Sequence, residues 1–122
     1  MKARALFIAV AACTAMPVFA AEPAMEKDGM LVDHSGMTLY TYDKDADGKS
    51  TCNDQCAVNW PPLKAMADAK PMGDWTVITR DDGSKQWAYD DKPLYTFKMD
   101  KKAGDMTGDG KGDVWHVAMP QD

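Results

Sequence analysis

Leu39-Tyr40-Thr41-Tyr42 returns 55 residues later in the chain as Leu94-Tyr95-Thr96-Phe97. The same offset also aligns Asp45 with Asp100, Asp54 with Asp109, and Trp60 with Trp115. Similarity at a fixed period is the signature of a duplicated structural unit. Chance can produce one Leu-Tyr-Thr match, but it hardly produces acidic and tryptophan matches in the same register. We therefore interpret the chain as two tandem repeats, at about residues 30–63 and 77–118.

Short strands separated by turns are predicted throughout both repeats. Alternating apolar residues and turn signals such as Asp82-Gly83 indicate strands at residues 30–33, 38–42, 75–80, 85–89, 93–98 and 113–118. A short helical turn is expected near the cysteines, at residues 52–59, and Pro61-Pro62 would end it. The prediction is a mainly β fold: one small domain, residues 30–119, made of two tandem β-rich repeats. A pseudo-twofold relation fits the duplication, although the sequence does not fix it.

The segments outside the repeats are assigned from composition. Residues 1–20 are predicted to be a signal peptide, residues 21–29 a flexible N-terminal tail, and residues 64–73 a linker. Lys2 and Arg4 precede an apolar run, and Val18-Phe19-Ala20 offers a small-x-small cleavage site near Ala20. The alternative, lipid anchoring at Cys13, is disfavoured because it leaves the apolar residues 15–21 unexplained. We expect a periplasmic or secreted protein with no transmembrane segment after signal cleavage.

The acidic composition restricts the possible partners. The chain has 14 Lys+Arg against 19 Asp+Glu and a formal net charge of −5, and signal cleavage would remove two bases and no acids. Such a chain is repelled by phosphate backbones, and it contains no basic run, so nucleic-acid binding is not expected. The expected partner is an envelope protein or a small ligand, which the sequence does not identify.

Cys52 and Cys56 are the cysteines that remain after cleavage. An isolated pair in an oxidising compartment usually forms a disulfide, and the short loop it closes gives this one a local role. The alternative is copper binding or thiol redox chemistry at the pair, with His34 or His116 as a further ligand and eight methionines as soft donors. Because these methionines are scattered along the chain, the plain disulfide is favoured.

An acidic segment follows the first repeated strand. It reads Asp43-x-Asp45-x-Asp47-Gly48 and has Asp54 at the twelfth position, which is the spacing of a calcium loop. However, the eighth position is Ser50 instead of an apolar residue, the twelfth is Asp instead of Glu, and no flanking helices are apparent. A solvated acidic turn is the favoured interpretation, with a calcium site at the four aspartates as the alternative.

The repeated Tyr-x4-Asp units, Tyr40 with Asp45 and Tyr95 with Asp100, accompany the repeated Trp60 and Trp115. An aspartate after a strand accepts hydrogen bonds from backbone amides and closes a turn. A tyrosine fills core space while its hydroxyl finds a polar partner. This structural role is favoured over ligand contact. The sequence shows no nucleophile motif, phosphate-binding glycine loop or dinucleotide fingerprint, so no enzymatic activity is expected.

Several of these motifs together are distinctive. They are Leu39-Tyr40-Thr41-Tyr42-Asp43, Ser50-Thr51-Cys52, Trp60-Pro61-Pro62-Leu63, Arg80-Asp81-Asp82-Gly83 and Pro93-Leu94-Tyr95. Over about residues 30–118 the chain resembles a bacterial family of secreted repeats with a Tyr-x4-Asp motif, described as predicted lipoproteins. The resemblance implies export, a repeated unit and a Cys-x3-Cys pair in the first copy, with lipidation in many members, but no established function.

The sequence therefore predicts a non-catalytic exported envelope protein that serves as a binding or structural module for an unknown ligand. The alternative is a periplasmic metal-handling protein. It would hold calcium at the Asp-rich loop, or copper at Cys52 and Cys56 with help from histidine and methionine side chains.

Overall fold

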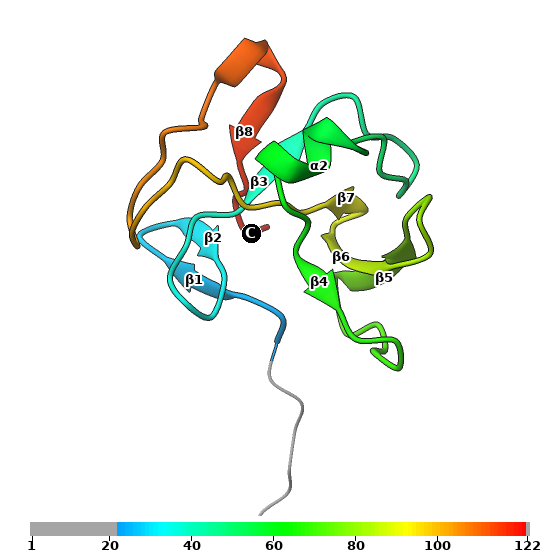
Figure 1. The fold of residues 1–122 in the computed structure, drawn as a ribbon. Coiled ribbons are helices and arrows are strands. Elements are labelled where there is room, and N and C mark those ends of the chain that lie inside the picture. Colours follow the sequence, from blue (N-terminus) through cyan, green and yellow to red (C-terminus); the bar gives the residue numbers. More distant parts are fainter. Residues whose placement is uncertain (1–21, 122) are drawn as a thin grey trace, which may run out of the picture.

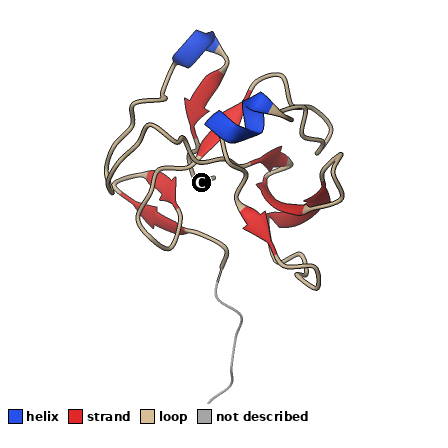
Figure 2. Cartoon of the chain, viewed as in Figure 1, coloured by secondary structure: helices blue, strands red, loops and turns tan. Residues whose placement is uncertain are grey.

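The computed structural model describes residues 22–121 of the chain. The predicted signal peptide, its cleavage site near Ala20 and Cys13 lie outside this range. Strands and turns make up most of the described chain, and the helices are single short turns (Figure 2). The elements, in order, are β1 (Met25–Lys27), β2 (Met30–Val32), β3 (Tyr40–Tyr42), α2 (Gln55–Asn59), β4 (Lys64–Ala65), β5 (Trp75–Thr79), β6 (Lys85–Tyr89), β7 (Lys92–Pro93), η1 (Lys111–Asp113) and β8 (Trp115–Val117). The predicted mainly β fold is confirmed.

The strands form three small antiparallel sheets. They have the orders β1-β2, β3-β8 and β4-β6-β5, and β7 also pairs with β6. In Figure 1 the β1–β2 hairpin lies on one side of the β3–β8 pair, and the sheet formed by β4 to β7 lies on the other. The β3–β8 pair joins a strand of the first repeat to the last strand of the second.

The predicted flexible tail at residues 21–29 contains a strand instead. Met25–Lys27 pairs with Met30–Val32 as β1, and Ala24 is buried in the core. Asp28 and Gly29 both have positive φ angles, 52° and 81°, as a two-residue hairpin turn requires. The side chains of β1 are all exposed, so the strand leaves no apolar pattern in the sequence. The predicted linker likewise begins with a strand, because Lys64–Ala65 forms β4 against β6.

The two repeats are interlocked through their backbones. The Tyr40 amide donates to the Tyr95 carbonyl (2.7 Å), and the Tyr95 amide donates to the Tyr40 carbonyl (3.0 Å). Leu63 N–H donates to the Leu94 carbonyl, and its counterpart, Ala118 N–H, donates to the Leu39 carbonyl, each at 2.8 Å. The last strand of each repeat therefore pairs with the tyrosine strand of the other, and a pseudo-twofold relation connects the two halves.

Two apolar clusters make up the core. One gathers residues of the hairpins and strand ends: Ala24, Leu31, Leu39, Trp75, Leu94 and Ala118. The other lies between the repeats and contains most of the repeated aromatic residues: Tyr40, Cys52, Trp60, Tyr95, Phe97 and Trp115. Since this second cluster draws side chains from both copies, neither copy buries its aromatic residues alone.

Candidate functional site

The two Tyr-x4-Asp units exchange partners across the repeats. The Tyr40 hydroxyl donates to Asp100 Oδ2 at 2.7 Å, and the Tyr95 hydroxyl donates to Asp45 Oδ2 at 2.6 Å. Each tyrosine thus bonds the aspartate of the other copy. The sequence spacing by itself would have allowed pairing within a copy.

The second oxygen of each aspartate closes a loop in its own repeat. Asp45 Oδ1 accepts from the Thr51 amide (2.7 Å) and from the Thr51 hydroxyl (3.0 Å). Asp100 Oδ1 accepts in the same way from the Thr107 amide (2.9 Å) and hydroxyl. These are the contacts of a turn-closing aspartate. Both carboxylates are therefore engaged on both oxygens, which leaves them little capacity for a ligand.

Burial changes the acidity of the two tyrosines. Removal from solvent, followed by the hydrogen bond to Asp100, raises the pKa of Tyr40 well above its usual value. Removal from solvent, followed by the hydrogen bond to Asp45, raises the pKa of Tyr95 in the same direction. A carboxylate acceptor favours the protonated phenol, so both hydroxyls stay donors at neutral pH.

Four aromatic rings form one column across the pseudo-twofold axis. Trp60 and Trp115 stack at the centre, with ring centroids 3.8 Å apart and planes inclined by 4°. Tyr42 stacks on Trp115 at 4.1 Å, and its counterpart Phe97 stacks on Trp60 at 4.0 Å. Gly108 lies against this column, since a Cβ there would come within 2.5 Å of the Trp60 ring. The repeated tryptophans are thus the shared centre of the two copies.

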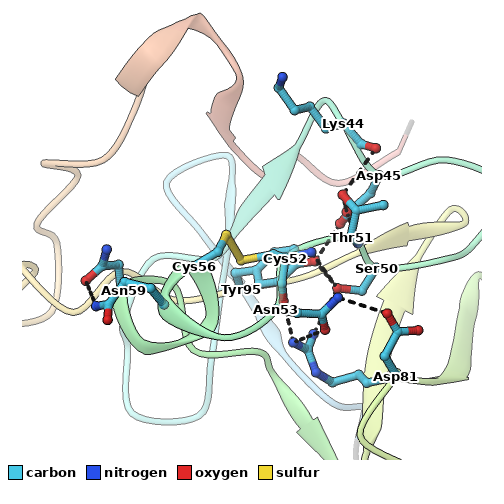
Figure 3. Close-up of a disulfide and its surroundings, with 12 residues drawn as sticks. Lys44, Asp45, Ser50, Thr51, Cys52, Asn53, Cys56, Asn59, Asp81 and Tyr95 are labelled. Atoms are coloured by element: carbon cyan, nitrogen blue, oxygen red, sulfur yellow. Dashed lines mark hydrogen bonds between the residues drawn. A yellow bond between two sulfur atoms is a disulfide. The ribbon is translucent and has the colours of Figure 1, made fainter.

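The cysteine pair is a disulfide, Cys52–Cys56, at the start of α2. Figure 3 shows it beside Tyr95, with Ser50 and Asp45 on the same loop. Cys52 is fully buried in the cluster between the repeats. Because the sulfurs are bonded to each other, they are not available as the thiolate ligands that the copper alternative requires.

Arg80 fastens the disulfide loop to the second repeat. It is 5 % exposed and donates to Ser50 Oγ (2.9 Å), to Gln86 Oε1 (2.7 Å) and to the Cys52 carbonyl. Ser50 Oγ is in turn 2.6 Å from the Tyr95 hydroxyl. Sequence reasoning missed this role of Arg80. The available signal was that it is the one arginine after Arg4 in an acidic chain.

Two of the four aspartates of the alternative calcium loop have partners of their own. Asp43 Oδ2 lies 2.7 Å from His116 Nε2, and Asp45 is taken by Thr51 and Tyr95. Asp47 and Asp54 are exposed, each with a positive φ angle. Within residues 22–121, no three His, Cys, Asp or Glu side chains gather closely enough to hold a metal ion. The calcium alternative therefore finds no set of converging ligand side chains in this loop, for which a solvated acidic turn was the favoured interpretation.

The soft donors suggested for copper are also dispersed. His34 Nε2 lies 2.7 Å from the Glu22 carbonyl oxygen, whereas His116 pairs with Asp43. Exposed methionine side chains occur at Met25, Met66, Met99, Met106 and Met119.

A groove of about 700 Å³ opens beside the linker between the repeats. Leu63, Met72 and Trp87 form its apolar floor and pack with their inner sides against the core. His34 and residues of the linker such as Met66 also line it. Its charged rim consists of Glu22, Asp33, Lys64, Asp68 and Lys70.

The equivalent place in the other half is a smaller hollow of about 210 Å³. Leu63 and Lys64 correspond there to Ala118 and Met119. Trp87 corresponds to Leu31, because each donates its amide to the last strand of the other repeat. The Trp87 amide donates to the Leu63 carbonyl, and the Leu31 amide donates to the Ala118 carbonyl. Two features distinguish the groove from the hollow. One is Trp87, and the other is the linker, which has no counterpart in the other half. Sequence reasoning did not predict the groove, since its residues come from four separate segments.

The comparisons with known proteins agree with this architecture. The model of a family described as a secreted repeat of unknown function matches residues 23–64 and again residues 76–119. The chain belongs to this family of secreted repeats, and the two matches coincide with the two interlocked halves. No curated protein and no solved structure matches the chain. In the part of the chain that the structure covers, no helix has the length and apolar character needed to cross a membrane.

Proposed function

We propose that this chain is a non-catalytic exported binding module that takes a small, partly apolar ligand in the groove beside the linker. The observation that carries the proposal is the groove floor, where Trp87, Leu63 and Met72 are only partly covered by the rest of the molecule. Ligand sites are typically concave, largely apolar and bordered by a few polar groups. The volume of about 700 Å³ suits a drug-sized molecule.

The place of the groove supports the same conclusion. The repeated tyrosine, aspartate and tryptophan side chains are engaged with one another, so the shared parts of the two copies have little capacity left for a ligand. The groove lies where the copies differ, at the linker and at Trp87. The rim ammonium groups of Lys64 and Lys70 form no ion pair with any residue in the described range. An aromatic or apolar molecule therefore fits the groove floor, and Lys64 and Lys70 offer ammonium groups to an anionic substituent among the three carboxylates of the rim.

Anilinonaphthalene sulfonate, an aromatic anion whose fluorescence rises in apolar surroundings, is a suitable probe. We expect saturable binding of one molecule to each folded chain, with energy transfer from tryptophan. Trp87→Leu should weaken binding at least tenfold, and Met66→Ser should weaken it several-fold. Met99→Ser is the matched control, because Met99 is also an exposed methionine but does not line the groove.

The Trp87→Leu chain must first be shown to be folded by its near-ultraviolet circular dichroism. Probe binding that does not saturate, or that is the same in the wild type, Trp87→Leu and Met66→Ser, would refute the groove as the binding site.

A further inference from the structure

The contacts that hold the domain together run mainly between its two halves. Tyr40 and Tyr95 exchange backbone hydrogen bonds, and each also bonds the aspartate of the other repeat. β3 of the first half pairs with β8 of the second, and Pro62 of the first half bridges to Tyr95 of the second. The arrangement is that of a twofold-symmetric dimer in which residue i contacts residue j and j contacts i.

The connection between the halves contributes one side chain, Met72, to the packing on the core and takes no part in the contacts just described. Between β4 and β5, residues 66–74 make a turn in which the Ala69 amide donates to the Met66 carbonyl, and a short bridge joins Met72 to Trp75. Neither contact reaches the aromatic column or the tyrosine–aspartate pairs. The role of the linker in assembling the halves is therefore to keep them at a high local concentration.

We propose that the interface between the repeats also acts between chains, so that two copies of this protein exchange equivalent halves. The first repeat of each copy then packs on the second repeat of the other, and the dimer consists of two complete globules. Every backbone and side-chain contact between the halves is kept in this exchange. Only the path of the linker and the entropy of association differ. Closed monomers dominate when the protein is dilute, because a short flexible linker gives the halves an effective concentration in the millimolar range.

Shortening the linker tests the proposal directly. Ala65 lies opposite Lys85 on one side of β6, and Trp75 lies opposite Tyr89 on the other. These positions are two strands apart and four residues apart along β6, hence about 16 Å from each other. Deleting residues 67–73 leaves three Cα–Cα steps between Ala65 and Trp75, which span at most about 11 Å. A single chain can then no longer close its own interface.

We expect the deletion variant to be a dimer with native circular dichroism and twice the monomer mass by light scattering. The matched control replaces residues 67–73 with seven Gly and Ser residues, which keeps the length and should keep the monomer. A native monomer, or a chain that stays unfolded at every concentration, would overturn the proposal.

A mixing experiment identifies the exchanged halves. In the deletion background, Trp60→Leu damages only first repeats and Trp115→Leu damages only second repeats. Unfolding the two variants together and refolding them yields a mixed dimer in which one globule carries both changes and the other carries neither. We expect a new melting transition at the temperature of the unsubstituted deletion variant.

If the tryptophan variants do not fold, Tyr40→Phe and Tyr95→Phe provide a milder pair on the same two halves. A mixture that melts as the plain sum of its two components shows that the halves are not exchanged and overturns the proposal. Probe binding in the groove plays no part in either readout, so the outcome is independent of the proposed function.

Discussion

Asp100 and Asp45 hold equivalent positions but differ in their access to water. Asp100 is 6 % exposed, whereas Asp45 is only partly buried. Tyr40 also accepts a hydrogen bond from the Gly108 amide. Removing its hydroxyl therefore leaves two buried groups without a partner, the Asp100 carboxylate oxygen and the Gly108 amide. A buried polar group left without a partner costs about 1–3 kcal/mol.

We therefore expect Tyr40→Phe to lower the free energy of unfolding by about 2–3 kcal/mol. Tyr95→Phe should have a comparable effect, because water can reach Asp45 but the buried Ser50 hydroxyl also loses a partner. Urea unfolding followed by circular dichroism measures both. Tyr89→Phe is the control, since its hydroxyl accepts only an exposed bond from the Gln121 amide. Equal effects of all three substitutions would contradict the importance of the exchange between repeats.

The same hydroxyls make stability sensitive to alkali. The pKa values of Tyr40 and Tyr95 are raised in the folded protein above the value of about 10 in an unfolded chain. The unfolded state consequently loses these protons first as the pH rises. The stabilisation is fully present below pH 10 and is lost above it, by up to about 1.4 kcal/mol per pH unit for each tyrosine.

Urea unfolding at pH 8, 9.5 and 11 should show this decline. In Tyr95→Phe the loss of stability between pH 9.5 and pH 11 should be about half that of the wild type. A loss that does not change with this substitution would assign the alkaline sensitivity to other groups.

At the scale of elements, the turn between β6 and β7 is the clearest place to gain stability. It consists of Asp90 and Asp91, with φ angles of 53° and 63°. The β1–β2 turn has glycine at its second position, where positive φ carries no steric penalty. We expect Asp91→Gly to raise the free energy of unfolding by about 0.5–1 kcal/mol and Asp91→Ala to lower it. Thermal melts of the two variants check this, and an equal response to Gly and Ala would contradict it.

The disulfide is predicted to stabilise the fold modestly. The loop from Cys52 to Cys56 is short, so cross-linking it removes little freedom from the unfolded chain, which corresponds to about 2 kcal/mol. Urea unfolding with and without a reductant measures the difference. The double variant Cys52→Ala/Cys56→Ala should be insensitive to the reductant. Complete unfolding on reduction would mean that the disulfide holds more than its own loop.

Sequence patterns predicted elements better than they predicted partners. The β5–β6 hairpin followed from alternating residues and the Asp82-Gly83 turn, and the 55-residue offset identified the duplication. The exchange of tyrosine and aspartate between copies could not be predicted, because the same spacing also allows Tyr40 to bond Asp45. The strand β1 was missed because its side chains are all exposed, and the groove was missed because its lining is assembled by tertiary structure.

At the scale of the whole molecule, the two halves should unfold together. Each completes the sheets and the aromatic cluster of the other, so neither has a core of its own. We expect a single transition with coincident midpoints for tryptophan fluorescence, far-ultraviolet circular dichroism and hydrogen exchange of the Tyr40 and Tyr95 amides. Separate midpoints for the two amides would show that one repeat persists without the other.

The face-to-face contact of Trp60 and Trp115 also restricts how the two copies diverge during evolution. A mutation at this contact in one copy alters the surface that the other copy must fit. The subunits of an obligate heterodimer restrict each other in the same way. Gly108 illustrates the result: the second copy has no room for a side chain where the indole of the first copy rests. The two faces of this contact are therefore complementary instead of identical, so a change at either tryptophan or at Gly108 must be accommodated by the other copy.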